Sequence, residues 1–338
     1  MKHPVRYAYV QPKVFAERAR LLGAEKYREL VECETLSCFR SRLLDTTYGD
    51  AMTSVSDDQL DIELALHGAY ATSLVRIVSG AGRKLISFVE SLVLAYEYEN
   101  VKLVARALIS GTSLDEIERY LHVKPEEALD RRHVLARLLT VRNLRDLVEV
   151  ITHANLIRGE SLPVLRYCAN VAESTGNTMP LELLLDFEWV AKVARSLRSL
   201  GRSEYKIGSY VLSPIVDYRV ALSIELCWKE KADKALQAVE QIATCLELDP
   251  ALLLRDPQRA LQTFANKFGL PSADERAVRA EALRRASRAY REYILTVGPL
   301  AGLIVFKMNE VSNLIAISRG IDLGLSPHEK MSLIVLPE

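Results

Sequence analysis

The 338-residue sequence is poor in residues that break helices, with 15 glycines and 12 prolines. It also has no charge excess, because 44 basic residues balance 44 acidic ones. Nucleic-acid-binding domains usually carry a basic surplus, so this balance argues against a nucleic-acid partner. No run of alternating apolar and polar residues predicts a sheet. With 49% apolar residues, the sequence is typical of a helical globular chain with substantial cores.

Motifs of the common catalytic and cofactor sites are missing. Gly80 and Gly82 are followed by basic residues, but they do not complete a phosphate-binding loop and no predicted strand precedes them. The six histidines lack metal-binding spacing, and no Gly-x-Ser-x-Gly elbow occurs. The acidic pairs 57–58 and 126–127 are expected at helix starts, where they complement the helix dipole. We therefore predict no catalytic residues, no metal and no cofactor.

Cysteine is scarce, and apolar runs are short. The five cysteines, at positions 33, 38, 168, 227 and 245, are scattered and include no Cys-x-x-Cys spacing. We expect free thiols in a reducing cytosol. Residues 1–13 contain no apolar run of the length of a secretory signal. The apolar stretch 293–306 is too short to cross a bilayer, so a core helix is expected there.

What the sequence does contain is a duplicated stretch. Residues 97–116 read EYENVKLVARALISGTSLDE, and residues 310–329 read EVSNLIAISRGIDLGLSPHE. A fixed register between two distant stretches predicts an internal duplication. The positions shared in register are Glu97 with Glu310, Asn100 with Asn313, Arg106 with Arg319, Gly111 with Gly324, Ser113 with Ser326 and Glu116 with Glu329.

Part of this shared pattern predicts where helices begin and end. Apolar residues at 101, 104, 105 and 108 fall on one helix face. Gly111 and Gly324 are expected to end their helices in the left-handed conformation. Ser113 and Ser326 each precede a glutamate by three residues, which is the spacing of a capping box.

Other shared residues are polar, although Glu97 and Asn100 lie on the same predicted face as the apolar residues. Two interpretations remain open, namely a structural hydrogen-bond network, the commoner case, or an inner surface used by a partner. We also predict that Asn313→Leu harms stability or assembly by leaving Glu310 unpaired, at a cost of about 1–3 kcal/mol. The candidate residues of this polar network are Glu97, Asn100, Arg106, Glu310, Asn313 and Arg319.

A third, degraded copy is expected near residues 217–226. Asp217 takes the place of the glutamate, Val220 that of the asparagine and Leu226 that of the arginine. We predict an all-α fold of three similar helical-bundle domains of usual size. Their predicted ranges are 1–112, 113–230 and 231–338.

The helix expected over 274–292 carries six arginines and is net basic. Such a run usually forms a solvated helix face. The alternative is a docking face for an acidic partner.

The C-terminal stretch 306–327, FKMNEVSNLIAISRGIDLGLSP, resembles the C subunit of archaeal and bacterial A/V-type ATPases, called subunit d in the vacuolar enzyme. The family pattern is an acid, then an asparagine with an apolar residue, then an arginine with a small residue. Glu310, Asn313 and Arg319 match it, and residues 96–108 match the family's earlier copy. Residues 16–22 and 43–49 resemble the family's opening, so the similarity spans nearly the whole chain. The middle copy departs from the pattern.

This resemblance implies a non-catalytic central-rotor subunit of a rotary A/V-type ATPase (ATP synthase). Members form a funnel of three similar helical domains around a pseudo-threefold axis. One end rests on the cytoplasmic face of the membrane proteolipid ring, and the open end receives the central shaft of subunits D and F. The stator membrane subunit is a further expected neighbour. We expect a peripheral protein that couples rotation to ion transport and to ATP synthesis or hydrolysis.

Two other classes of function remain open. A helical-repeat adaptor of another complex would form an open superhelix instead of a closed ring. An all-α enzyme would bring Glu97, Asn100, Glu310 and Asn313 together in one closed pocket.

Overall fold

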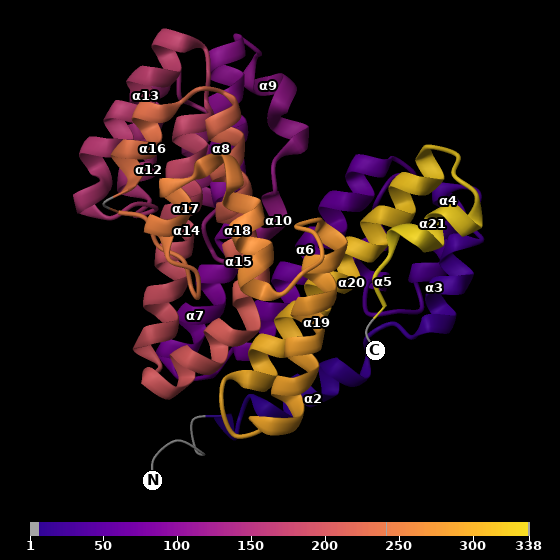
Figure 1. Cartoon of the computed structure of the whole chain (residues 1–338). Coiled ribbons are helices and arrows are strands. Elements are labelled where there is room, and N and C mark those ends of the chain that lie inside the picture. Colours follow the sequence, from indigo (N-terminus) through magenta and orange to yellow (C-terminus); the bar gives the residue numbers. More distant parts are fainter. Residues whose placement is uncertain (1–6, 241, 337–338) are drawn as a thin grey trace.

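The protein is built around three pairs of long helices, described in a computed structural model that covers residues 7–240 and 242–336. These residues contain helices and no β-strand, which confirms the all-α prediction. In the first pair, α6 (Gln59–Val78) is followed by α7 (Arg83–Val93) and α8 (Ala95–Ser110), two consecutive helices that we count together as its second member. The second pair is α14 (Met179–Ser199) with α15 (Arg202–Lys229), and the third is α19 (Glu275–Glu292) with α20 (Gly298–Asp322) (Figure 1).

Shorter helices connect the pairs. Before the first pair lie α2 (Gln11–Ala19), α3 (Ala24–Val31), α4 (Leu36–Leu43) and α5 (Gly49–Met52). Between the first and second lie α9 (Leu114–Ile117), η1 (Glu118–Tyr120), α10 (Val123–Ala128), α11 (Arg132–Leu138), α12 (Leu144–His153), η2 (Gly159–Ser161) and α13 (Leu162–Thr175). Between the second and third lie α16 (Asp233–Glu240), α17 (Pro250–Arg255), η3 (Pro257–Arg259) and α18 (Ala260–Phe268). The last helix, α21 (Pro327–Leu333), packs on α3, so an early and a late segment of the chain share one group of helices (Figure 1).

The repeated stretches end their helices as the sequence predicts. Gly111 and Gly324 adopt the left-handed conformation, with φ of 74° and 68°. Glycine suits these positions because a Cβ atom disfavours positive φ. The capping box at Ser326 is complete, with its partner Glu329 bonded to the Ser326 N–H. At Ser113 the hydroxyl accepts from the N–H of Asp115 instead.

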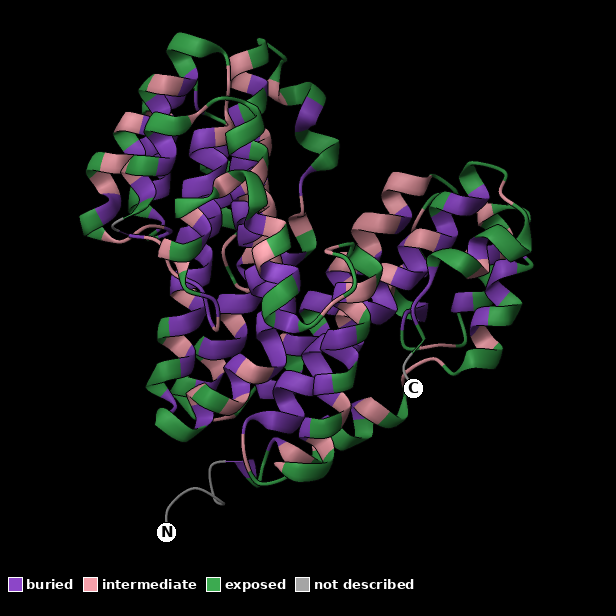
Figure 2. Ribbon diagram, viewed as in Figure 1, coloured by how far each residue is buried: buried purple, intermediate pink, exposed green. Residues whose placement is uncertain are grey.

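Helix α20 lies in the core of the molecule. It packs against α2, α6, α15 and α19, which leaves most of its residues buried. Its length and composition would suit a membrane span, but 83% of its most apolar window is buried inside the protein. Figure 2 shows the buried residues concentrated where the long helices meet. The prediction of a buried core helix over 293–306 is therefore confirmed for residues 298–306, and it is wrong for residues 293–297, which form the turn before α20.

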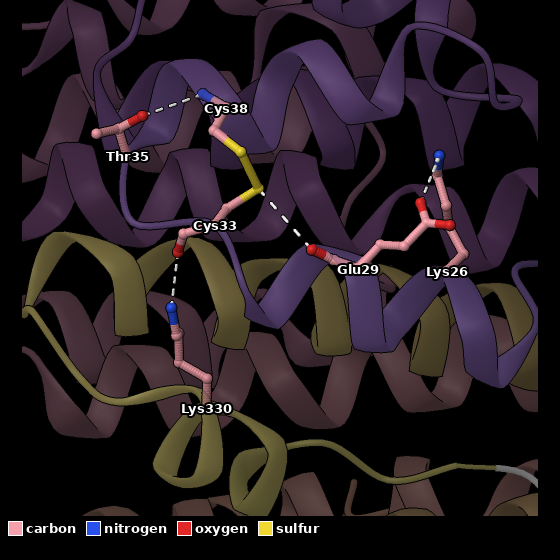
Figure 3. Close-up of a disulfide and its surroundings, with 6 residues drawn as sticks. All are labelled: Lys26, Glu29, Cys33, Thr35, Cys38 and Lys330. Carbon is pink, nitrogen blue, oxygen red and sulfur yellow. Dashed lines mark hydrogen bonds and ion pairs between the residues drawn. A yellow bond between two sulfur atoms is a disulfide. The ribbon is translucent and has the colours of Figure 1, made fainter.

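The expectation of five free thiols is wrong at two positions. Cys33 and Cys38 form a disulfide across the turn between α3 and α4, where their Cα atoms lie 5.6 Å apart (Figure 3). The turn brings the two residues together although their spacing matches no metal or redox motif. Lys330 of α21 donates a hydrogen bond to the Cys33 carbonyl at 2.7 Å, which ties the last helix to the same turn. The other three cysteines are free and buried.

Candidate functional site

The shared glutamates tie their helices to segments distant in the sequence. Glu97 of α8 is buried and accepts hydrogen bonds from the guanidinium of Arg131 at 2.5 and 2.7 Å. Glu310 of α20 is buried as well and accepts from the N–H of Leu22 at 2.5 Å and from the hydroxyl of Tyr48 at 2.8 Å. Glu97 therefore fastens the first turn of α8 to a neighbouring segment, and Glu310 fastens the middle of α20.

The degraded middle copy retains this feature. Asp217 of α15 accepts from the three consecutive N–H groups of residues 246–248, at 2.7, 2.9 and 3.0 Å. Burial raises the pKa of Asp217 to about 6, although the three backbone hydrogen bonds oppose that shift. All three copies thus place a buried acid where it anchors another part of the chain.

The shared asparagines also bind backbone groups. Asn100 accepts from the N–H of His122 at 2.8 Å and donates to the carboxyl of Glu126 at 3.2 Å. Asn313 exchanges two hydrogen bonds with the backbone of Val335, both 2.9 Å long. The expected cause of damage in Asn313→Leu is therefore corrected, because Glu310 bonds to residues 22 and 48 instead. The group left unpaired is the N–H of Val335, since the Val335 carbonyl also accepts from Asn309 at 2.8 Å.

Glu126 lies in the first turn of α10, the helix start expected of residues 126–127, but it is not an exposed charge there. It is buried in α10 next to Glu97, and one of its carboxyl oxygens has no partner within the described residues. Burial raises the pKa of Glu126 to about 9, and the negative charge of the neighbouring Glu97 adds to this effect. At neutral pH Glu126 therefore carries a proton.

The two shared arginines leave this network and reach the next helix pair. Arg106 of α8 bonds through Nε and Nη2 to the carboxylate of Glu182 on α14, with an Nε–Oε1 distance of 2.9 Å. Arg319 of α20 bonds in the same way to Glu63 on α6, at 2.7 and 3.1 Å. The contact from the third pair to the first thus has the same form as the contact from the first pair to the second.

The second and third pairs are joined differently. Leu226 occupies the arginine position on α15, and here α19 supplies the cation. Arg285 donates to the carbonyl of Tyr210 at 2.9 Å, to the hydroxyl of Ser213 at 3.2 Å and to Glu247 at 3.0 Å. The helix α19 is therefore not simply a solvated arginine face, because Arg285 is buried. Arg279 also faces inward and bonds to the side chain of Asn309.

One buried ion cluster was missed by sequence reasoning. Lys102 of α8 bonds to Asp186 of α14 at 2.6 Å, and Arg219 of α15 bonds to the same carboxylate at 2.7 Å. Burial opposes ionisation of Asp186, but the two cations outweigh it and lower its pKa to about 2. The sequence did contain a signal for this cluster, namely single charged residues within apolar helical stretches. Buried charges need partners, so such residues indicate an ion pair.

A cavity of about 520 Å³ opens where the three helix pairs meet. Its wall is mainly apolar, and each pair contributes to it. The lining includes Tyr70, Leu92 and Tyr96 from the first pair, Ile215, Val216 and Leu222 from the second, and Ile304, Val305 and Met308 from the third. Charged residues from different pairs, Glu99, Arg219, Glu275 and Arg279, also reach it.

Two histidines lie against one another in the wall of this cavity. The rings of His67 and His122 are 5.2 Å apart in an edge-to-face arrangement, and His67 Nδ1 lies 2.9 Å from the hydroxyl of Tyr96. Burial, with the neighbouring His67 adding to the effect, lowers the pKa of His122 to about 4. The described residues hold no group of three or more metal-ligating side chains.

The structure does not bring the six candidate residues into one pocket. Glu97 and Asn100 meet around Glu126, whereas Glu310 and Asn313 bond to chain segments near residues 22, 48 and 335. The arrangement required of the all-α enzyme hypothesis is therefore not found for these residues. Four of the six form structural ties, and the two arginines join neighbouring helix pairs.

Comparison with known proteins gives a consistent result. The family model for the ATP synthase (C/AC39) subunit matches residues 10–332. The chain is similar to the C subunit of the A-type ATP synthase of Methanocaldococcus jannaschii, at 24% identity over 97% of this chain and 86% of the relative. It is also similar to the corresponding subunit of Haloferax volcanii, at 26% identity over 94% of each chain, and to that of Halobacterium salinarum, at 24% over 98% of each.

Proposed function

This chain belongs to the ATP synthase (C/AC39) subunit family, and from this premise we propose that it is a non-catalytic central-rotor subunit of an A-type ATP synthase. In this role the three helix pairs form a funnel with pseudo-threefold symmetry. The funnel joins the central shaft of subunits D and F to the membrane proteolipid ring. The subunit lies on the cytoplasmic side of the membrane and passes rotation between ring and shaft.

The repeated arginine contacts support a closed ring of three units. Arg106 links the first pair to the second, and Arg319 links the third pair back to the first with the same chemistry. In an open superhelix the third unit would have no such partner on the first. The three domain ranges 1–112, 113–230 and 231–338 stay a prediction, with their boundaries close to the ends of α8 and α15.

The shared cavity is the single observation that carries the socket role. All three helix pairs line it, so anything seated there touches the whole body at once. An α-helix is about 10 Å across and rises about 5.4 Å per turn, so a cavity of this size holds about one turn. A mainly apolar wall with charges of both signs suits the tip of a helical shaft.

Rigid transmission of torque requires that the units do not slide past one another. The buried Lys102–Asp186–Arg219 cluster and the anchoring acids Glu97 and Glu310 fix long helices to their neighbours. Close-packed interiors transmit strain because they have low compressibility.

Copurification tests the proposal. A tagged copy of this chain, expressed in the source cell, should isolate the shaft subunits and the proteolipid ring from detergent-solubilised membranes. Stripping the complex of its shaft should leave the chain on the ring. Isolation of an ATP synthase that lacks this chain, with the tagged chain bound to a different complex, would contradict the proposed role.

A further inference from the structure

Helix α2 connects two of the turns that lie within the helix pairs. Gln11 donates a hydrogen bond to the carbonyl of Ile294 at 2.6 Å, in the turn between α19 and α20. Lys13 donates to the carbonyl of Ser79 at 3.1 Å, in the turn between α6 and α7. Figure 1 shows α2 and the α19–α20 turn together at the bottom of the view.

The turn within the second pair joins the same end. Glu204, in the first turn of α15, accepts a hydrogen bond from the N–H of Val297 at 2.7 Å. The three turns and α2 therefore form one continuous end of the molecule. We call this surface the turn end and define it as residues 9–13, 76–84, 195–206 and 288–298.

The turn end is strongly basic although the whole chain is neutral. Its four segments contain ten basic and two acidic residues, so the remaining chain contains 34 basic and 42 acidic residues. One of the two acids, Glu204, is buried, and the other, Glu292, pairs with Arg288 at 2.8 Å. The exposed basic residues are Arg76, Arg83, Lys84, Arg195, Arg198, Arg202, Lys206, Arg288 and Arg291.

Helix dipoles account for only part of this charge. Cations are favourable in the last turn of a helix, and the first helices of the pairs each end with one, namely Arg76, Arg198 and Arg291. Arg83 and Lys84 instead lie in the first turn of α7, and Arg202 begins α15, where the dipole disfavours cations. Within the described residues none of these last three forms an ion pair, so fold stability does not explain them.

Exposed apolar side chains lie among these cations. Ile294 is 48% exposed and Leu295 is 60% exposed, both in the α19–α20 turn. Tyr9, beside the α6–α7 turn, is 54% exposed. Apolar and aromatic side chains flanked by lysine and arginine are the chemistry of proteins that rest on a membrane surface.

We propose that the turn end binds an anionic lipid surface. Arg83, Lys84 and Arg202 pair with lipid phosphates, and Ile294 and Leu295 enter the headgroup layer. This inference rests on the proposed function, because a subunit beside a membrane ring turns one end to the lipid, and it names that end. An acidic protein loop is the competing occupant. The apolar tips, and cations spread over three turns instead of gathered at one point, favour lipid.

Vesicle flotation with the purified full-length chain tests the proposal. The chain should float with vesicles of equal parts phosphatidylglycerol and phosphatidylcholine, should not float with phosphatidylcholine alone, and should be released by salt. The variant R83E/K84E/R202E should lose at least about tenfold in affinity, because each cation near an anionic surface contributes about 1 kcal/mol. The control R137E/R142E/R145E makes the same charge change on α11, on α12 and in the turn between them, and it should bind like the parent.

The apolar tips have a matched control as well. I294S/L295S should weaken flotation severalfold, whereas L323S changes a 73% exposed leucine outside the turn end and should have no effect. Circular dichroism of every variant tests whether it is folded. Equal flotation of the parent and R83E/K84E/R202E would overturn the proposal.

A further outcome separates this inference from the proposed function. If the parent ignores anionic vesicles while R83E/K84E/R202E fails to join the ATP synthase, the turn end binds a protein and the lipid proposal is wrong. The proposed function would stand in that case. Its own failure would appear as the absence of the parent chain from the purified complex.

Discussion

The two outer copies of the repeated stretch and the middle copy bond to their neighbouring helix pairs through arginines that come from different sides of the contact. On α8 and α20 an arginine leaves the helix and bonds to the next pair, and both arginines are more than half exposed, at 55% and 57%. On α15 that arginine is Leu226, and a buried arginine arrives from α19 instead. Neighbouring units can therefore be joined by an arginine from the helix of the repeated stretch or from the helix that packs on it. The arginine is exposed in the first case and buried in the second.

The largest effect should come from the buried arginine of the middle interface. Arg285→Leu removes the partner of the Tyr210 carbonyl and of Glu247, and one of two cations on the buried carboxylate of Glu281. Breaking a buried ion pair costs about 3–5 kcal/mol, so unfolding in urea should show a loss of that order. Arg288→Leu on the same helix removes an exposed pair with Glu292 and should cost at most about 1 kcal/mol. If both variants lost similar amounts of unfolding free energy, the buried arginine would matter no more to stability than the exposed one.

Asn313→Leu should rank second. It leaves the N–H of Val335 without a partner and removes one of the two donors to the Val335 carbonyl, at a cost of about 1–3 kcal/mol. Asn100→Leu does the same to the N–H of His122 and should lose a similar amount, since both residues serve one role in two copies. Chemical denaturation of the two variants measures whether they lose similar amounts of unfolding free energy. Parent-like stability of Asn313→Leu would show that the asparagine is not a structural tie.

The first copy should also respond to pH through Glu126. Its pKa is raised to about 9 in the folded protein from 4.5. The stability from this proton is therefore complete below pH 4.5 and is lost as pH rises toward 9. Glu126→Gln cannot ionise, so the parent should lose up to about 1.4 kcal/mol per pH unit more than the variant between these limits. Urea unfolding across this range measures the slopes. Glu127→Gln, next in sequence, should keep the parent's slope.

The smallest effect is expected at the exposed arginines. Arg319→Leu should cost about 1 kcal/mol or less and lose its effect in high salt. Burial opposes ionisation of Glu63, but hydrogen bonds from His67, Arg319 and Gln59 outweigh it and lower its pKa to about 2. Glu63 therefore stabilises the fold above pH 4.5, and that contribution is lost as pH falls toward 2. When the free energy of unfolding is measured as a function of pH, Arg319→Leu should lose less of it than the parent between pH 4.5 and 2. An unchanged acid profile would mean that Arg319 contributes nothing to Glu63.

The sequence predicted the features that depend on local pattern. Periodicity and the glycines at 111 and 324 located helix ends, and the register of two copies located the buried polar residues. It could not predict partners, because Arg285, Asp186 and Arg219 find theirs on helices far away in the chain. The cysteine pair at 33 and 38 was missed for a different reason, since a turn and not a motif brings the sulfurs together.

The central claim is that the cavity shared by the three helix pairs receives the shaft. A photo-reactive amino acid at Met308, which lines the cavity, tests it in the assembled complex. Irradiation should cross-link this position to a shaft subunit, while the same group at the exposed Leu323 should not. Cross-links from Met308 only to the proteolipid ring, or only within the chain, would contradict the account.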